Sequence, residues 1–186
     1  MRTKIEVDGV FWILLAMSVI LIPIKWIFAW VIAAVIHELC HLLATMCFRC
    51  PVDKIKICAA GTKIQTGPLT AFAGFICEAA GPIGSLLLLL LAKWMPTMAI
   101  CGFFQGVFNL LPFYPLDGRR IIERITVGCL PAAYAIKAAV VIQYTVAIVI
   151  FLGAFWLLYM GCGPFPLLIV MLLIWNDRKN TLQKRG

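Results

Sequence analysis

Two histidines and a glutamate carry the chemistry that this sequence suggests. His37, Glu38 and His41 form an H-E-x-x-H motif, and the chain contains only 2 histidines, both of them in this motif. A helix turns once about every 3.6 residues, so histidines four positions apart can offer ring nitrogens to one ion. In this motif the histidines bind zinc and the glutamate acts as a general base on water. The spacing therefore predicts a zinc centre built on one helix.

The helix that must position this motif is apolar. Residues 31–48 read VIAAVIHELCHLLATMCF, an apolar run that the motif interrupts. A charged side chain at the centre of a membrane helix costs about 2.5 to 3.5 kcal/mol on insertion scales, so ionisable residues there favour a functional site. The alternative is a pair of helix-packing histidines beside a protonated Glu38.

A catalytic zinc site needs a third protein ligand, which must come from elsewhere in the chain. Glu78 and Asp117 are the remaining acids within apolar segments. Asp117 is the better candidate because Pro112 and Pro115 break the preceding helix, and Gly118 lets the backbone turn beside it. We expect an extended segment with unpaired carbonyls there. Glu78 is expected to be a helix-contact residue. Alternatively, it could orient a metal-binding histidine without itself contacting the metal.

The composition places the chain among membrane proteins. Hydrophobic residues make up 63% of it and the mean hydropathy is +1.02. The net charge of +8 comes from short clusters that flank apolar runs, which indicates membrane topology and argues against nucleic acid as a partner. The 8 cysteines are scattered, mostly in apolar segments, where a free thiol behaves as a small hydrophobe. Cys47 and Cys50 form a C-x-x-C that could alternatively be a redox or metal pair.

The apolar runs predict an all-α polytopic membrane protein with about six spans in a single domain over residues 1–186. A β-hairpin is expected at 52–66, where apolar and polar residues alternate, with a surface loop as the alternative. Because this stretch is too polar to face lipid, we expect it at the membrane interface or wedged among helices. No cleavable signal peptide is expected, and the last run is short for a full crossing. The expected spans are 10–24, 26–48 with the metal motif, 69–91 or 69–94, 98–111, 138–160 and 165–175.

Charge distribution predicts the orientation of these spans. With both termini in the cytoplasm, all of the 16 lysines and arginines except Lys25 and Lys93 lie on the cytoplasmic side. Residues 119–124 form a basic, amphipathic stretch that we expect at the interface. At about 1.5 Å per residue, His41 lies about 10 to 12 Å inside the helix end marked by Arg49. The metal site is therefore expected to lean towards the cytoplasm.

Three motifs, in order, resemble the site-2 protease family of intramembrane zinc metalloproteases. They are His37-Glu38-Leu-Cys-His41, then Ala-Gly81-Pro82 with Ser85 following, then a segment within 98–118 that runs from NLLP to LDG; the match covers roughly residues 30–125. The short chain, the hairpin and the sequence NLLPFYPLDG are most similar to the stage IV sporulation branch (FB). The sequence departs from the pattern in two ways: Ser85 stands where the family often has asparagine, and Arg119 stands where the family often has a second glycine. Many sporulation-type relatives carry a C-terminal CBS domain, and none is expected here.

The resemblance implies a role for each matched residue. His37, His41 and Asp117 would ligate one zinc ion, and Glu38 would take a proton from water. Asn109 would hold the substrate segment or the oxyanion. The remaining matched positions, implied to be substrate-binding or structural, are Gly81, Pro82, Ser85, Pro112 and Gly118.

The function expected from these residues is cleavage of a membrane-tethered regulatory protein close to the cytoplasmic face, by resemblance a pro-sigma or anti-sigma factor in a bacterial cell membrane. The target span should unwind, because a helical peptide bond is shielded by its own hydrogen bonds, and the hairpin at 52–66 could receive it by strand addition. A separate membrane protein is the expected regulator. The alternative is a metal transporter, or a catalytically silent protein that captures transmembrane segments.

Overall fold

The computed structural model describes residues 4–7, 22–49, 52–58, 61–66, 69–114 and 116–161, together with 171 and 174. The chain divides into two compact units, Met1–Leu110 and Leu111–Gly186. The single domain expected over the whole chain stays a prediction.

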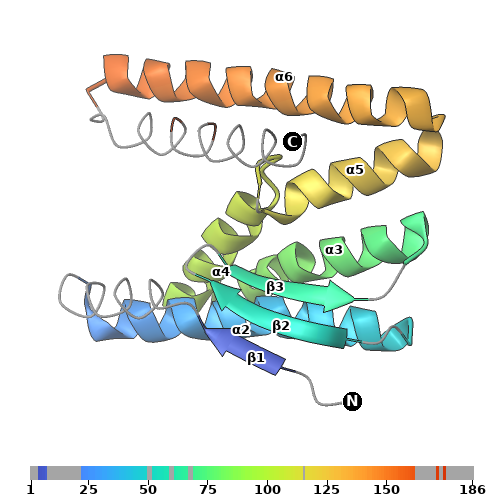
Figure 1. Cartoon of the computed structure of the whole chain (residues 1–186). Coiled ribbons are helices and arrows are strands. Elements are labelled where there is room, and N and C mark those ends of the chain that lie inside the picture. Colours follow the sequence, from blue (N-terminus) through green and yellow to red (C-terminus); the bar gives the residue numbers. More distant parts are fainter. Residues whose placement is uncertain are drawn as a thin grey trace. The chain divides into compact units, whose positions relative to one another are not determined.

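Three helices pack together in the first unit (Figure 1). They are α2 (Ile24–Cys47), α3 (Ala71–Leu87), which continues into the 3₁₀ turn η1 (Leu88–Leu91), and α4 (Pro96–Asn109). The hydroxyl of Thr70 caps the start of α3 by accepting a hydrogen bond from the Ala73 N–H at 3.2 Å. A small apolar cluster holds the three elements together, consisting of Ala29, Ala33, Leu88, Met98 and Cys101.

Small residues on α3 and α4 set the close spacing of these helices. A Cβ atom at Gly84 would collide with the Sγ of Cys40 on α2, and one at Gly102 would lie 2.6 Å from the Ser85 carbonyl oxygen. Glycine at such positions lets backbones approach, as in other membrane helix pairs. The helices therefore approach each other closely around residues 81–85.

A three-stranded sheet of order β1-β2-β3 also belongs to the first unit. Strand β2 (Val52–Cys58) pairs antiparallel with β3 (Gly61–Thr66), and β1 (Lys4–Val7) pairs parallel with β2. No strand was expected at β1, because a short polar segment acquires its strand character only from the partner beside it. The expected association of residues 52–66 with the membrane stays a prediction.

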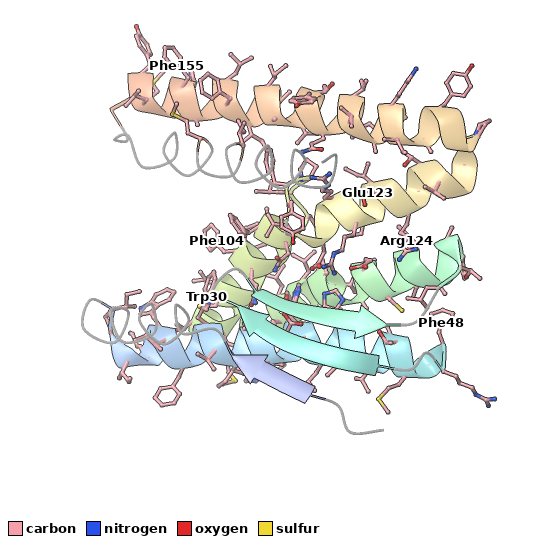
Figure 2. All side chains as sticks on the ribbon, viewed as in Figure 1. Trp30, Phe48, Phe104, Glu123, Arg124 and Phe155 are labelled. Atoms are coloured by element: carbon pink, nitrogen blue, oxygen red, sulfur yellow. The ribbon has the colours of Figure 1, made fainter. Side chains whose placement is uncertain are left out.

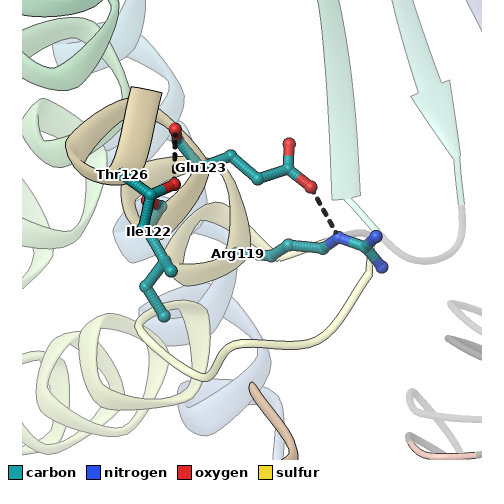
Figure 3. Close-up of polar contacts among 4 residues, drawn as sticks. All are labelled: Arg119, Ile122, Glu123 and Thr126. Carbon is teal, nitrogen blue, oxygen red and sulfur yellow. Dashed lines mark hydrogen bonds and ion pairs between the residues drawn. The ribbon is translucent and has the colours of Figure 1, made fainter. Parts of the chain in front are cut away.

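The second unit contains α5 (Asp117–Cys129) packed against α6 (Ala132–Tyr159). Phe113 and Leu116, which precede α5, are buried in a cluster with Ala147 of α6. Along α5, the Arg119 Nε donates to the Glu123 carboxylate at 2.9 Å (Figure 3). The Thr126 hydroxyl bonds back to the helix carbonyls of Ile122 at 3.0 Å and Glu123 at 3.1 Å, which satisfies it on a buried helix face (Figure 3).

Three helical segments of the described part of the chain are long and apolar enough to cross a membrane: Ile24–Cys47, Ala71–Leu91 and Tyr134–Trp156. Their outward faces carry large apolar side chains, including Trp30 and Phe155 (Figure 2). These features make the chain an integral membrane protein.

Six crossings are not confirmed. Helix α4, the expected fourth span, has 14 residues, which reach about 21 Å and fall short of a hydrocarbon core of about 30 Å. The expected first span at 10–24 lies outside the described residues except for 22–24, and the last at 165–175 lies outside them except for 171 and 174.

Candidate metal centre

His37 and His41 lie one turn apart on the buried face of α2. Their side chains are 3% and 9% exposed, and their Nε2 atoms are 3.2 Å apart. The rings stand nearly perpendicular, with centroids separated by 4.8 Å. The helical period thus brings two imidazole nitrogens to one point inside an otherwise apolar helix pair.

Helix α3 holds both rings by their other nitrogen. The Nδ1–H of His41 donates to the Cys77 carbonyl oxygen at 2.7 Å, and the Nδ1 of His37 lies 2.9 Å from the Ser85 hydroxyl. A carbonyl oxygen only accepts, so His41 carries a proton on Nδ1, and Nε2 is the nitrogen through which the neutral ring can bind a metal ion. Hydrogen-bond partners of the ring nitrogen that does not bind the metal, here called outer partners, fix the tautomer and orientation of metal-binding histidines.

The distance between the two Nε2 atoms suits a zinc ion. Two nitrogens bound to one tetrahedral zinc at about 2.0 to 2.1 Å lie about 3.3 Å from each other, close to the 3.2 Å found here. Lone pairs at this separation repel unless a proton or a cation lies between them. The donor chemistry and the spacing of the pair therefore fit a metal ion.

Gly81 explains how α3 approaches the histidines so closely. A Cβ atom at this position would collide with the His41 Nε2 and lie 2.6 Å from two ring carbons. Pro82 follows, buried inside α3, and its missing N–H interrupts the helix ladder at this point. Both residues, expected from the sequence to be structural or substrate-binding, border the histidine pair.

Two acids of the first unit lie on the same two helices as the histidines and their partners. Glu38 follows His37 on α2 and is half-buried, and Glu78 follows Cys77 on α3 and is half-buried as well. The general-base role of Glu38 and the role of Glu78 stay predictions.

In the second unit, Asp117 is the first residue of α5 and is 8% exposed. The expected extended segment before it is instead a series of turns, in which the Leu111 carbonyl accepts from the Phe113 N–H at 2.9 Å and the Phe113 carbonyl accepts from the Leu116 N–H at 2.8 Å. The carbonyls at these two positions are therefore paired, contrary to expectation, because turns satisfy them locally.

His37, His41 and Asp117 together offer two imidazoles and one carboxylate, a donor set that could hold a metal ion and that zinc accepts in catalytic sites. The other matched residues of this part of the chain lie between positions 109 and 118. Asn109 is half-buried at the end of α4, whereas Pro112 and Gly118 are buried.

Two features of the first unit were not foreseen from the sequence. The Cys77 carbonyl is a backbone group, and no side-chain pattern reports which carbonyl a distant histidine will reach. Gln105 is a polar residue buried on α4, 9% exposed, in a stretch that reads only as an apolar helix. A glutamine within a predicted membrane span was the available signal.

A solved structure shares this architecture. The Site-2 Protease from Methanocaldococcus jannaschii is similar with a TM-score of 0.64 and 19% sequence identity, over 96% of this chain and 91% of that chain. The chain has the fold of a site-2 protease. No family model and no curated protein sequence matches the chain. The resemblance indicated by the motifs is thus confirmed for the fold, and the sporulation branch is not confirmed.

Proposed function

We propose that this protein is an intramembrane zinc metalloprotease that hydrolyses a peptide bond in or near a transmembrane segment of a membrane-tethered protein. The observation that carries the proposal is the pair of Nε2 atoms 3.2 Å apart, on rings whose Nδ1 atoms are both held by α3. A helix-packing role needs no such convergence of two ring nitrogens. The site-2 protease fold supports the same assignment.

His37, His41 and Asp117 would hold the ion, and their buried positions would keep it apart from bulk water. When bound, zinc acidifies water and polarises a carbonyl group. Glu38 accepts a proton from the attacking water and returns it to the leaving amide nitrogen. Asn109, at the end of α4, binds the substrate segment or the developing oxyanion.

The substrate must present an unwound segment, because a peptide bond inside a helix is shielded by its own hydrogen bonds. Strands β2 and β3 offer backbone groups that such a segment could join as an added strand. We propose a membrane-tethered regulatory protein, such as a pro-sigma or anti-sigma factor, cleaved near the cytoplasmic face of a bacterial membrane. A separate membrane protein would restrain the activity, and both termini would be cytoplasmic, as the distribution of basic residues indicates.

The test compares the wild type with Glu38→Gln against a tethered substrate, with bound zinc measured in both. Glutamine keeps the shape of the side chain and removes the base, so zinc should be retained and processing lost. Equal processing by both proteins would contradict the protease mechanism. A metal transporter needs ligands but no base, so wild type and Glu38→Gln would both bind zinc and neither would cleave the substrate.

A further inference from the structure

Gln105 places an unpartnered polar atom inside the three-helix unit. Its side chain is 9% exposed, and its Oε1 accepts no hydrogen bond from any residue that the structure describes. A buried acceptor left without a donor is costly, and native structures rarely keep one without a reason.

The register of the helices places Gln105 level with the histidine pair. Helix α3 meets α2 where Ser85 bonds His37, and it meets α4 where a Cβ at Gly102 would lie 2.6 Å from the Ser85 carbonyl. One turn away along α3, a Cβ at Gly106 would lie 3.1 Å from the Pro82 carbonyl. The section of α4 between 102 and 106 therefore faces the segment of α3 that holds the rings.

The contacts of α2 with α4 also place Gln105 at the same height along the helices as His37. Cys101 packs in one cluster with Ala33. Helix α3 is antiparallel to both α2 and α4, so these two run in the same direction. Gln105 lies one turn after Cys101, and His37 lies one turn after Ala33 in that same direction.

The Ser85 hydroxyl group can donate a hydrogen bond. For His37 to bind a cation through Nε2, its Nδ1 must carry the proton and donate to the Ser85 Oγ at 2.9 Å. The Ser85 hydroxyl then acts as acceptor in that bond, and its own hydrogen is left to donate. Within the described part of the chain this bond to His37 is the one hydrogen bond of a side chain that is 0% exposed.

We propose that Gln105 Oε1 accepts the Ser85 hydroxyl hydrogen through one bridging water, so that Gln105 positions His37 for metal binding through Ser85. This inference rests on the proposed metalloprotease function. It makes Gln105 a positioning residue, which acts on the ion only through Ser85 and His37. The acceptor holds the serine hydroxyl in the orientation that receives the His37 proton, and thereby fixes the lone pair of Nε2 towards the metal.

The test measures zinc affinity by chelator competition, and the absorption bands of bound Co²⁺, in the full chain in detergent. Gln105→Met keeps the size of the side chain and removes the acceptor, and we expect it to weaken zinc binding about tenfold and to shift the cobalt bands. Gln105→Glu keeps an acceptor oxygen and should restore affinity. Gln143→Met is the matched control, because Gln143 is equally buried at 9% on α6, a helix without a candidate ligand.

A second comparison separates this role from simple packing. Combined with Ser85→Ala, Gln105→Met should cause no further loss, because both changes interrupt one relay. If Gln105 has no partner, its replacement by methionine should instead raise thermal stability and leave zinc affinity unchanged, and that result would overturn the inference. Should Gln105→Met fail to fold, Gln105→Leu takes its place in the same comparison. A wild type that binds no zinc would overturn the proposed function itself, so the two failures are distinguishable.

Discussion

Replacing Gly81 with alanine is expected to disturb His41 more than the helix that carries the change. The new Cβ would lie 2.6 Å from Cδ2 and Cε1 of the ring, whereas ordinary contacts begin at 3.4 Å. The ring must therefore retreat by at least about 0.8 Å, and by more where Nε2 meets the new Cβ, since well-packed interiors leave little other room. If it moves away from α3, its 2.7 Å bond to the Cys77 carbonyl lengthens to about 3.5 Å or more, beyond the usual range for N–H···O bonds.

Two free-energy terms of opposite sign then act on stability. Alanine in a helix is favoured over glycine by about 0.5 to 1 kcal/mol, whereas overpacking costs about 1 to 3 kcal/mol. We expect Gly81→Ala to lower the free energy of unfolding by about 1 to 2 kcal/mol. Zinc affinity should fall about 10- to 100-fold, as when the outer partner of a metal-binding histidine is lost.

The assay is zinc affinity by chelator competition together with thermal unfolding in detergent. Gly153→Ala on α6 is the matched control, because a Cβ there meets nothing within 4 Å. This control should keep zinc affinity and gain about 0.5 to 1 kcal/mol. If Gly81→Ala bound zinc as tightly as the wild type, the reasoning that ties the α2–α3 spacing to ring position would be refuted.

Three further outcomes are expected. Asp117→Ala should weaken zinc binding by more than about a hundredfold, the upper limit for outer partners, since it removes a candidate ligand; unchanged affinity would remove it from the ligand set. Proline substitutions at alternate positions of β2 should reduce cleavage of a tethered substrate without reducing bound zinc, because they remove backbone donors, and full cleavage would count against strand addition. Glu123→Ala should change thermal stability by less than about 0.5 kcal/mol, because its ion pair with Arg119 is half exposed, and a larger loss would give that pair a structural role.

The sequence by itself determined the membrane class, the helix that carries the motif and the pairing of its histidines. These are local properties: apolar composition over a span, and a period that returns His41 to the side of His37 after four residues. The helical period requires no other part of the chain, which is why the histidine pair could be predicted before any tertiary contact was known.

Only the tertiary structure decided what holds the histidines in place. The Cys77 carbonyl and the Ser85 hydroxyl reach the rings from a helix 36 to 48 residues away, and Gly81 has meaning only because His41 packs on it. The same holds for β1, whose strand comes from its pairing with β2, and for the turns that precede Asp117. Backbone acceptors, close approaches and non-local pairing depend on which surfaces meet, and a linear pattern of side chains does not encode that directly.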